Sequence, residues 1–274
     1  MNIGVIGCGS IGSRHARNLV ALGHRPWLYD VRPVGQPATG CTITNRLDDL
    51  ACHVEAVLIC TPAHTHTSVL RQLGECGYAG PVFVEKPICD TLADAKDWRD
   101  WPHPVVMVGY NLRFHHALLA LRASVRRPTA GEFYLDCDMR QWPGRDYGMI
   151  LTEGSHELDA ALFCGAPARV GQVDILTTTR ATFWLDKDIG ARWLIDLDGD
   201  CQKYLRHWAL GSPSQPDQSP VRFTSPEVLG DEMYLDELAH FLRAVEGGPI
   251  APGCTREEGI VVLDVIEQVR RLGQ

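Results

Sequence analysis

The sequence has no excess of positive charge, because 26 Lys and Arg residues stand against 34 Asp and Glu residues and give a formal net charge of −8. A nucleic-acid-binding protein presents a basic surface, so this balance argues against DNA or RNA as a partner and favours a small molecule. Apolar runs of about 18 residues and the charged and apolar regions of a signal peptide are also missing. We therefore expect a cytoplasmic protein with no membrane partner.

Signatures of metal binding and of a disulfide framework are missing as well. The ten cysteines are spread from Cys8 to Cys254 without a Cys-x-x-Cys pair, and the eleven histidines show no His-Glu-x-x-His spacing. Scattered cysteines inside apolar runs are typical of buried free thiols. The sequence thus predicts no metal, and most of its cysteines are expected to be buried thiols.

What is present is the composition of a globular protein, with 45% hydrophobic and 22% charged residues in 274 positions. This length exceeds the usual domain of about 100 to 200 residues, so we expect two domains or one large α/β domain. The first 110 residues alternate short apolar runs with amphipathic stretches, which is typical of βαβ units. The expected strands are residues 3–6, 26–29, 56–60, 82–85 and 105–108, and the expected helices are 10–22, 65–76 and 91–101.

After residue 112 the pattern changes to extended runs joined by short turns, which favour an antiparallel sheet. Expected strands are 132–140, 169–178, 181–185, 191–198 and 204–210, expected helices are 153–164, 231–245 and 255–272, and 211–226 is expected to be a loop. The sequence therefore predicts an α/β protein. Residues 1–112 form a dinucleotide-binding Rossmann domain with a doubly wound parallel sheet, and residues 113–274 form an α+β domain with a mostly antiparallel open sheet.

A glycine-rich segment, Gly7-Cys8-Gly9-Ser10-Ile11-Gly12, follows the first strand and opens the first helix. In such a loop the first glycine permits the tight turn, the second lets a pyrophosphate approach the backbone, and the third allows close packing. The helix N-terminus adds free N–H donors and a partial positive charge. We expect this loop, including Ser10 and Ile11, to hold a nicotinamide dinucleotide; FAD, S-adenosylmethionine or an empty strand-turn-helix are the alternatives.

Asp30 ends the second expected strand, where an acidic side chain accepts hydrogen bonds from the adenosine ribose hydroxyls and favours NAD. Arg32 lies close enough in sequence to pair with a 2′-phosphate, or to be an ordinary surface arginine. Repulsion between Asp30 and a 2′-phosphate is the larger effect. We expect NAD, with NADP as the alternative.

Several later segments resemble the Gfo/Idh/MocA family, named for glucose-fructose oxidoreductase and inositol dehydrogenase. The resemblance covers essentially the whole chain and implies NAD(P)-dependent oxidation or reduction of a hydroxyl or carbonyl, usually on a sugar or cyclitol. It also implies that the C-terminal domain binds substrate and that its open sheet forms homodimers or homotetramers. The matching segments are Cys60-Thr61-Pro62-Ala63-His64-Thr65-His66, Glu85-Lys86-Pro87, Gly109-Tyr110-Asn111-Leu112-Arg113-Phe114 and Gly154-Ser155-His156-Glu157-Leu158-Asp159.

The resemblance implies roles for individual residues. Lys86 would contact substrate and nicotinamide, with a cis bond to Pro87, and His156 would transfer the proton. Further cofactor contacts would be Cys60, Thr61, Pro62, His66 and Glu85, and further substrate contacts would be Asn111, Arg113, Arg145, Glu153 and Asp159.

The chemistry of Lys86 and His156 agrees with these roles. Oxidation of a carbinol needs a base for the hydroxyl proton, and histidine, with an ordinary pKa near ~6.5, works at neutral pH. Lys86 follows a buried parallel strand, at the edge where ligands bind in open α/β sheets, and its charge polarises an oxygen. The structural alternatives are a surface lysine paired with Glu85 and a helix-face histidine bonded to a backbone carbonyl.

The sequence departs from the family four residues before the histidine, where Thr152 replaces a common Asp and Glu153 follows one place later. A shift of one residue turns a side chain by about 100° around a helix, so Glu153 is not a simple replacement. Asp159, one turn after His156, is a second candidate carboxylate, with a polar contact between helices as its structural alternative.

Arg140-Gln141-Trp142-Pro143-Gly144-Arg145-Asp146-Tyr147 resembles a motif of relatives in bacterial surface-sugar pathways, although the segment after it is shorter here. Arg113 and Arg145 are candidates to bind a carboxylate or phosphate. Stretches around Trp184, Trp193 and Trp208 are expected either in an oligomer interface or in the core.

Two other functions remain alternatives to a sugar or cyclitol dehydrogenase. The absent carboxylate at position 152 is compatible with a non-catalytic dinucleotide-binding sensor or regulator. A reductase of a non-sugar substrate, such as an imine or a linear tetrapyrrole as in biliverdin reductase, is the second.

Overall fold

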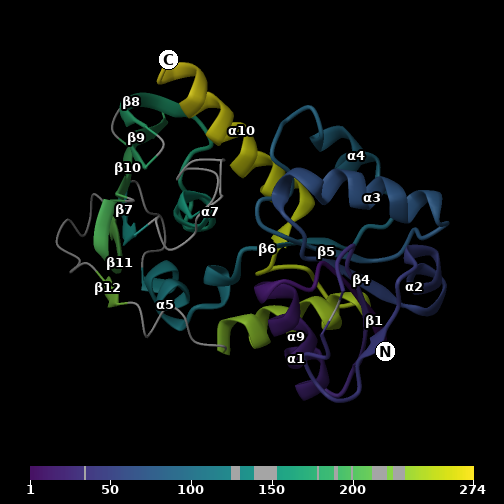
Figure 1. Cartoon of the computed structure of the whole chain (residues 1–274). Helices are drawn as coiled ribbons and strands as arrows, with labels where there is room; N and C mark the ends of the chain where they lie inside the picture. Colours follow the sequence, from purple (N-terminus) through teal and green to yellow (C-terminus); the bar gives the residue numbers. More distant parts are fainter. Residues whose placement is uncertain are drawn as a thin grey trace. The chain divides into compact units, whose positions relative to one another are not determined.

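A computed structural model describes residues 1–33, 35–124, 130–138, 153–177, 179–187, 191–198, 200–211, 221–224 and 232–274. The chain forms two compact units (Figure 1). Unit 1 comprises Met1–Asn111 and Asp231–Ile260, and unit 2 comprises Leu112–Gly230 and Val261–Gln274. The chain first passes from unit 1 to unit 2 after Asn111, beside the expected domain boundary at residue 112. Residues 231–260, which were expected in the second domain, belong to unit 1 instead.

Unit 1 contains a seven-stranded sheet with the order β13-β6-β5-β4-β1-β2-β3. Its strands are parallel except for β13, which pairs antiparallel with β6. The expected parallel Rossmann-type sheet is confirmed, and β3 and β13 are added to it because two-residue strands carry no periodicity in sequence. The strands are β1 (Asn2–Ile6), β2 (Arg25–Tyr29), β3 (Thr42–Ile43), β4 (Ala56–Ile59), β5 (Val82–Glu85), β6 (Val106–Gly109) and β13 (Cys254–Thr255).

The helices of unit 1 follow the strands in the expected alternation. Expected helix 91–101 is shorter in the structure, because Thr91 bonds the side chain of Asp94 at 2.7 Å and the helix begins only at Ala95. The helices are α1 (Ser10–Ala21), α2 (Leu47–His53), the 3-10 turn η1 (Ala63–Thr65), α3 (His66–Glu75), α4 (Ala95–Asp100), α9 (Glu232–Val245) and α10 (Arg256–Leu272), which continues into unit 2.

Helix α9 belongs to unit 1 because its apolar face packs there. It lies beside α1 (Figure 1), and its Phe241 ring meets the Phe83 ring of β5 edge to face with centroids 5.6 Å apart. Met233, Leu238 and Leu242 of the same helix are also buried. Burial of this face against sheet and helix explains why the chain returns to unit 1.

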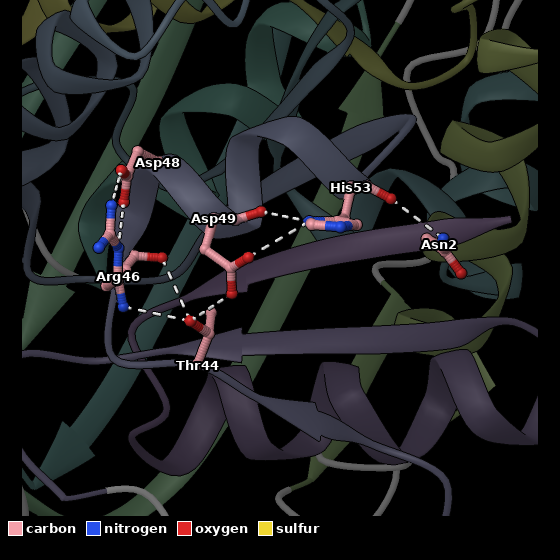
Figure 2. A network of polar contacts seen from close by, with 6 residues as sticks. All are labelled: Asn2, Thr44, Arg46, Asp48, Asp49 and His53. Carbon is pink, nitrogen blue, oxygen red and sulfur yellow. Dashed lines mark hydrogen bonds and ion pairs between the residues drawn. The ribbon is translucent and has the colours of Figure 1, made fainter.

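Helix α2 was not expected from the sequence, and Figure 2 shows the polar contacts that hold it. The Thr44 hydroxyl donates to the Asp49 carboxylate at 2.8 Å, and the Asn2 side-chain amide donates to the His53 carbonyl at 3.0 Å. The His53 ring stacks on Trp27 of β2 with centroids 4.6 Å apart. Only Leu47 and Leu50 of α2 are buried, so the helix is fixed by tertiary contacts that apolar periodicity does not reveal.

Unit 2 contains a six-stranded sheet with the order β12-β11-β7-β10-β9-β8. Only β7 and β10 pair in parallel, which confirms the mostly antiparallel sheet. Strand β12 lies within the stretch expected to be a loop. The strands are β7 (Ala130–Asp138), β8 (Val170–Leu176), β9 (Arg180–Lys187), β10 (Ala191–Asp198), β11 (Asp200–Gly211) and β12 (Val221–Thr224), and the helical segments are η2 (Asn111–Phe114), α5 (His116–Ser124) and α7 (Gly154–Phe163).

One face of this second sheet forms a core with α7, which contacts β7 and β10. Trp193 and Trp208 are 1% and 0% exposed and belong to this core, so the core interpretation of these two tryptophans is the correct one. Trp184 lies on the opposite face, where its indole N–H donates to Asp174 at 2.9 Å. Trp184 therefore lies on the face of the sheet that does not carry this core.

Three further features concern the described residues only. No helix among them is long and apolar enough to cross a membrane, and they contain no group of three or more His, Cys, Asp and Glu side chains placed to hold a metal. Eight described cysteines are free thiols. Cys60, Cys89, Cys164 and Cys254 are buried and the other four are not, so burial is less general than expected.

Candidate active site

The glycine loop joins β1 to α1, and its three glycines face different surroundings. A Cβ on Gly7, whose φ is +91°, would lie 2.8 Å from backbone atoms of Cys60 and Thr61. A Cβ on Gly12 would lie 1.9 Å from the carbonyl oxygen of Gly7, whereas one on Gly9 would meet nothing within 4 Å. Gly7 and Gly12 are therefore required by the packing of the turn, and Gly9 leaves an open approach to the backbone.

The first turn of α1 is free to bind an anion. Gly9 is the N-cap residue, no side-chain hydrogen bond caps the helix, and no acidic residue lies in its first turn. The first amides of a helix have no partner within the helix, and the helix dipole adds a partial positive charge. A phosphate placed over Gly9 would accept hydrogen bonds from these amides.

Asp30 follows β2 and is held beside this loop. Its carboxylate accepts the backbone N–H of Cys8 at 2.8 Å and that of Arg32 at 2.9 Å. Burial by itself raises the pKa of Asp30, but these donors and the Arg32 guanidinium, 3.5 Å away, outweigh it and hold the pKa below its ordinary value. Asp30 thus presents an ionised, oriented carboxylate next to the glycine loop, and the exposed Arg32 pairs with it.

The segment after β4 contains a fully buried histidine. The Nε2 atom of His66 lies 2.7 Å from the Thr61 carbonyl oxygen, and its Nδ1 atom lies 3.0 Å from the Pro87 carbonyl oxygen. Burial lowers the pKa of His66, against the opposite effect of the two carbonyls. With 0% exposure, His66 has no surface to offer a cofactor, and it connects two loops instead.

Lys86 follows β5 at the carboxyl edge of the parallel sheet. The Lys86–Pro87 bond is cis, as the family resemblance implied, and Lys86 is half-buried. Glu85 directs its carboxylate to His15 of α1, whose Nε2 atom is 2.8 Å away. The two neighbours of Lys86 are therefore both in contact with histidines, Glu85 with His15 of α1 and Pro87 with His66 of α3. Both helices begin at the carboxyl edge of the parallel sheet.

His156 lies in the first turn of α7 and is 8% exposed. Two acidic residues close to it in sequence, Glu153 and Glu157, both lie against Arg206 of β11. The Arg206 guanidinium contacts Glu157 closely and is 3.7 Å from Glu153, and the Trp208 indole N–H donates to Glu157 at 2.5 Å. The Glu153 carboxylate is thus directed toward Arg206.

Arg113 and Asp159 form a second buried ion pair in unit 2. The guanidinium donates to both carboxylate oxygens, with the shortest distances 2.7 and 2.9 Å, and the two side chains are 2% and 0% exposed. Both residues were expected to bind substrate. The structure instead matches the structural alternative for Asp159, a polar contact between helical segments, and Asn111 beside them is buried as well.

Arg145, the whole Arg140–Tyr147 motif and Thr152 lie outside the described residues. Three residues of these networks were missed by sequence reasoning: His15, Glu157 and Arg206. Their partners are 70 residues away for His15 and 49 residues away for Arg206, so no local spacing could have identified them.

Known proteins are similar in sequence to this chain. Residues 1–100 match the model of an oxidoreductase family with an NAD-binding Rossmann fold, GFO_IDH_MocA. Inositol 2-dehydrogenase of Rhizobium meliloti (strain 1021) is 28% identical over 99% of this chain and 96% of its own length. UDP-N-acetylglucosamine 3-dehydrogenase of Acidithiobacillus ferrooxidans is 28% identical over 69% of this chain and 64% of its length.

Solved structures show the same fold along the chain. A structure of UDP-N-acetylglucosamine 3-dehydrogenase from Acidithiobacillus ferrooxidans superimposes with a TM-score of 0.82 and 21% identity, covering 99% of this chain and 97% of that one. Scyllo-inositol dehydrogenase from Lactobacillus casei, solved with NAD(H) and scyllo-inositol, gives a TM-score of 0.80 at 14% identity over 99% and 96% of the two chains.

Proposed function

We propose, from the match of residues 1–100 to the GFO_IDH_MocA oxidoreductase family model, that this chain is a dehydrogenase or reductase acting on CH–OH groups. It transfers a hydride between NAD and a hydroxyl or carbonyl carbon of a sugar, a nucleotide sugar or a cyclitol. The observation that carries this proposal is the open approach to Gly9 at the uncapped N-terminus of α1. Full-length similarity to an inositol 2-dehydrogenase supports the substrate class.

NAD fits the residues of unit 1. Gly7, Gly9 and Gly12, with the amides of Ser10 and Ile11, would hold the pyrophosphate, and Asp30 would accept the ribose hydroxyls. The ionised Asp30 carboxylate would repel a 2′-phosphate, and the Arg32 guanidinium is already paired with Asp30. Both features favour NAD over NADP. Bound NAD supplies the acceptor, or in reverse the donor, of the hydride.

Lys86 and His156 carry the remaining chemistry in this proposal. In oxidation the substrate C–H electron pair leaves as hydride, the O–H proton passes to His156, and a C=O bond forms. The Lys86 ammonium donates a hydrogen bond to the same oxygen and stabilises negative charge as that proton leaves. Unit 1 would bind the cofactor and unit 2 would supply substrate contacts, among them Arg145.

Thermal-shift titrations with NAD(H) and NADP(H), followed by NADH absorbance assays on cyclitols, sugars and nucleotide sugars, test the proposal. We expect Asp30→Ala to weaken NAD binding about tenfold or more, because hydrogen bonds to a charged group are lost. Lys86→Ala and His156→Ala should each lower kcat by about 100-fold or more, whereas Lys96→Ala, an exposed lysine on α4, should not.

Two results would contradict the proposal. Turnover that survives both Lys86→Ala and His156→Ala would exclude these residues as polarising and proton-transfer groups. Tight NAD binding without turnover on any of the three substrate classes would instead indicate a dinucleotide-binding regulator.

A further inference from the structure

Two fully buried histidines engage the residues on either side of Lys86. His15, from α1, places its Nε2 atom 2.8 Å from a carboxylate oxygen of Glu85, and His66, from α3, places its Nδ1 atom 3.0 Å from the carbonyl oxygen of Pro87. Both histidines are 0% exposed. The proposed function assigns no task to either of them at these positions.

The same histidines are connected to the glycine loop. His15 follows Gly12 by three residues on α1, so it lies about one turn further along the helix whose N-terminus faces the open approach at Gly9. His66 reaches the Thr61 carbonyl oxygen with its Nε2 atom at 2.7 Å. Thr61 in turn packs so closely on the loop that a Cβ on Gly7 would lie 2.8 Å from its backbone nitrogen.

Histidine suits both positions because its ring is rigid and carries nitrogens on two sides. At position 15 the partner is a carboxylate, which only accepts, so Nε2 is the donor, and the ring packs edge to face on Phe83 with centroids 5.4 Å apart. At position 66 both partners are carbonyl oxygens of different loops, so the neutral ring donates its single N–H to one of them and contacts the other. The ring spans the gap between the loop after β4 and the turn after β5.

We propose that His15 and His66 are positioning residues, a histidine clamp that fixes the Glu85–Lys86–Pro87 turn relative to the glycine loop. The proposal rests on the function proposed above, in which Lys86 must meet the reacting oxygen. Neither histidine is a catalytic residue, because neither has any exposed surface with which to touch substrate or cofactor. Fixing the backbone on both sides fixes the position from which the Lys86 side chain extends, and a misplacement of about 1 Å costs about 100-fold in rate.

Labelling of Lys86 tests the clamp without requiring turnover. The chain has four lysines, Lys86, Lys96, Lys187 and Lys203, so peptide mapping after treatment with pyridoxal 5′-phosphate and borohydride resolves each site. The exposed Lys96 on α4 serves as the internal reference. His15→Phe and His66→Phe keep a ring but remove the donors, whereas His15→Gln and His66→Gln restore one. His64→Gln, an exposed position two residues before His66, is the matched control.

We expect each Phe variant to raise the ratio of Lys86 to Lys96 labelling by about fivefold or more, because a hydrogen bond that restrains the turn is lost. The Gln variants should fall between the Phe variants and the unmodified chain, and His64→Gln should match the unmodified chain. If a Phe variant loses its cooperative melting transition, the Gln variant at that position decides. Labelling ratios equal to that of the unmodified chain in the folded variants at both positions would overturn the clamp.

A kinetic measurement distinguishes positioning from general support of the fold. With a substrate that is turned over, kcat should fall by about tenfold or more in the Phe variants, while the Kd for NADH stays within about threefold. A parallel loss of NADH affinity with kcat unchanged would overturn the proposal in favour of a cofactor-binding role. If no substrate is turned over, the proposed function fails, and the labelling ratio still decides whether the clamp exists.

Discussion

Gly9 and Gly12 lie three residues apart in one loop, but the structure separates their roles. A Cβ on Gly12 would lie 1.9 Å from the Gly7 carbonyl oxygen, whereas a Cβ on Gly9 would have open space around it. We therefore expect Gly12→Ala to destabilise unit 1 by about 1–3 kcal/mol, as overpacking does. Gly9→Ala should leave the free energy of unfolding within about 1 kcal/mol of the unmodified chain and still weaken NAD binding.

Urea unfolding and NADH fluorescence titration measure the two effects separately. Gly23→Ala is a useful reference, because Gly23 has a positive φ at the end of α1 but no neighbour within 4 Å and no place in the loop. Its effect should be on stability alone. Unchanged NADH affinity in Gly9→Ala would show that the dinucleotide does not approach this part of the backbone.

At the scale of elements, α7 is joined to β11 by the Arg206 cluster. One guanidinium, 2% exposed, faces Glu157 and Glu153, and Trp208 donates to Glu157. Replacing Arg206 by Leu leaves buried carboxylates without their cation, so we expect a loss of about 3–5 kcal/mol in the free energy of unfolding. Urea denaturation measures it.

Arg180→Leu is the matched control for Arg206→Leu, because it removes an exposed ion pair instead of a buried one. Arg180 pairs with Asp198 at 3.5 Å in the same sheet, but the two side chains are 46% and 25% exposed, so about 1 kcal/mol or less is expected. Adding Glu157→Leu to Arg206→Leu should recover part of the loss, because the uncompensated charge is removed. Equal effects of Arg206→Leu and Arg180→Leu would show that the cluster does not anchor α7.

At the scale of the whole molecule, unit 1 is built from two separate stretches of chain. A fragment of residues 1–112 lacks α9 and β13, which would expose the apolar surface that Phe241 and its neighbours cover and leave β6 as an edge. We expect this fragment to melt without cooperativity and to bind no NADH. A fragment that joins 1–111 to 231–260 through a Gly/Ser linker should melt cooperatively, and circular dichroism with NADH titration compares the two.

Stability should also depend on pH below neutrality. Burial lowers the pKa of His66 in the folded chain, so the unfolded chain takes up a proton as the pH falls through ~6.5 while the folded chain does not. The stability that neutral His66 contributes is therefore present above that pH and is lost as the pH falls toward the folded pKa. The slope contributed is at most about 1.4 kcal/mol per pH unit.

Urea midpoints between pH 8 and pH 5 measure this slope in the unmodified chain and in His66→Gln, and the variant should give the flatter profile. His24, whose pKa is lowered by its partial burial and by the N-terminal charge, contributes in the same direction and remains in both proteins. Identical slopes in the two proteins would mean that His66 titrates alike in the folded and unfolded chains.

The sequence by itself determined the features that depend on residues close to one another in the chain. The five expected strands of the parallel sheet, the three expected helices between them and the glycine loop follow from periodicities of two and 3.6 residues and from glycine spacing. Short or polar elements, such as α2, β3 and β13, carry too few apolar residues for such a pattern. Their positions depend on contacts such as Thr44 with Asp49 (Figure 2).

Only the tertiary structure decided which polar side chains bind one another. Arg113 and Asp159 were both candidates for substrate binding, but they lie 46 residues apart in sequence and form one buried pair. Glu85 reaches His15 across 70 residues, and His66 reaches Pro87 across 21. A buried charge or donor needs a partner, yet the sequence does not say which of several it will take. That choice is made by the packing of elements distant in the chain.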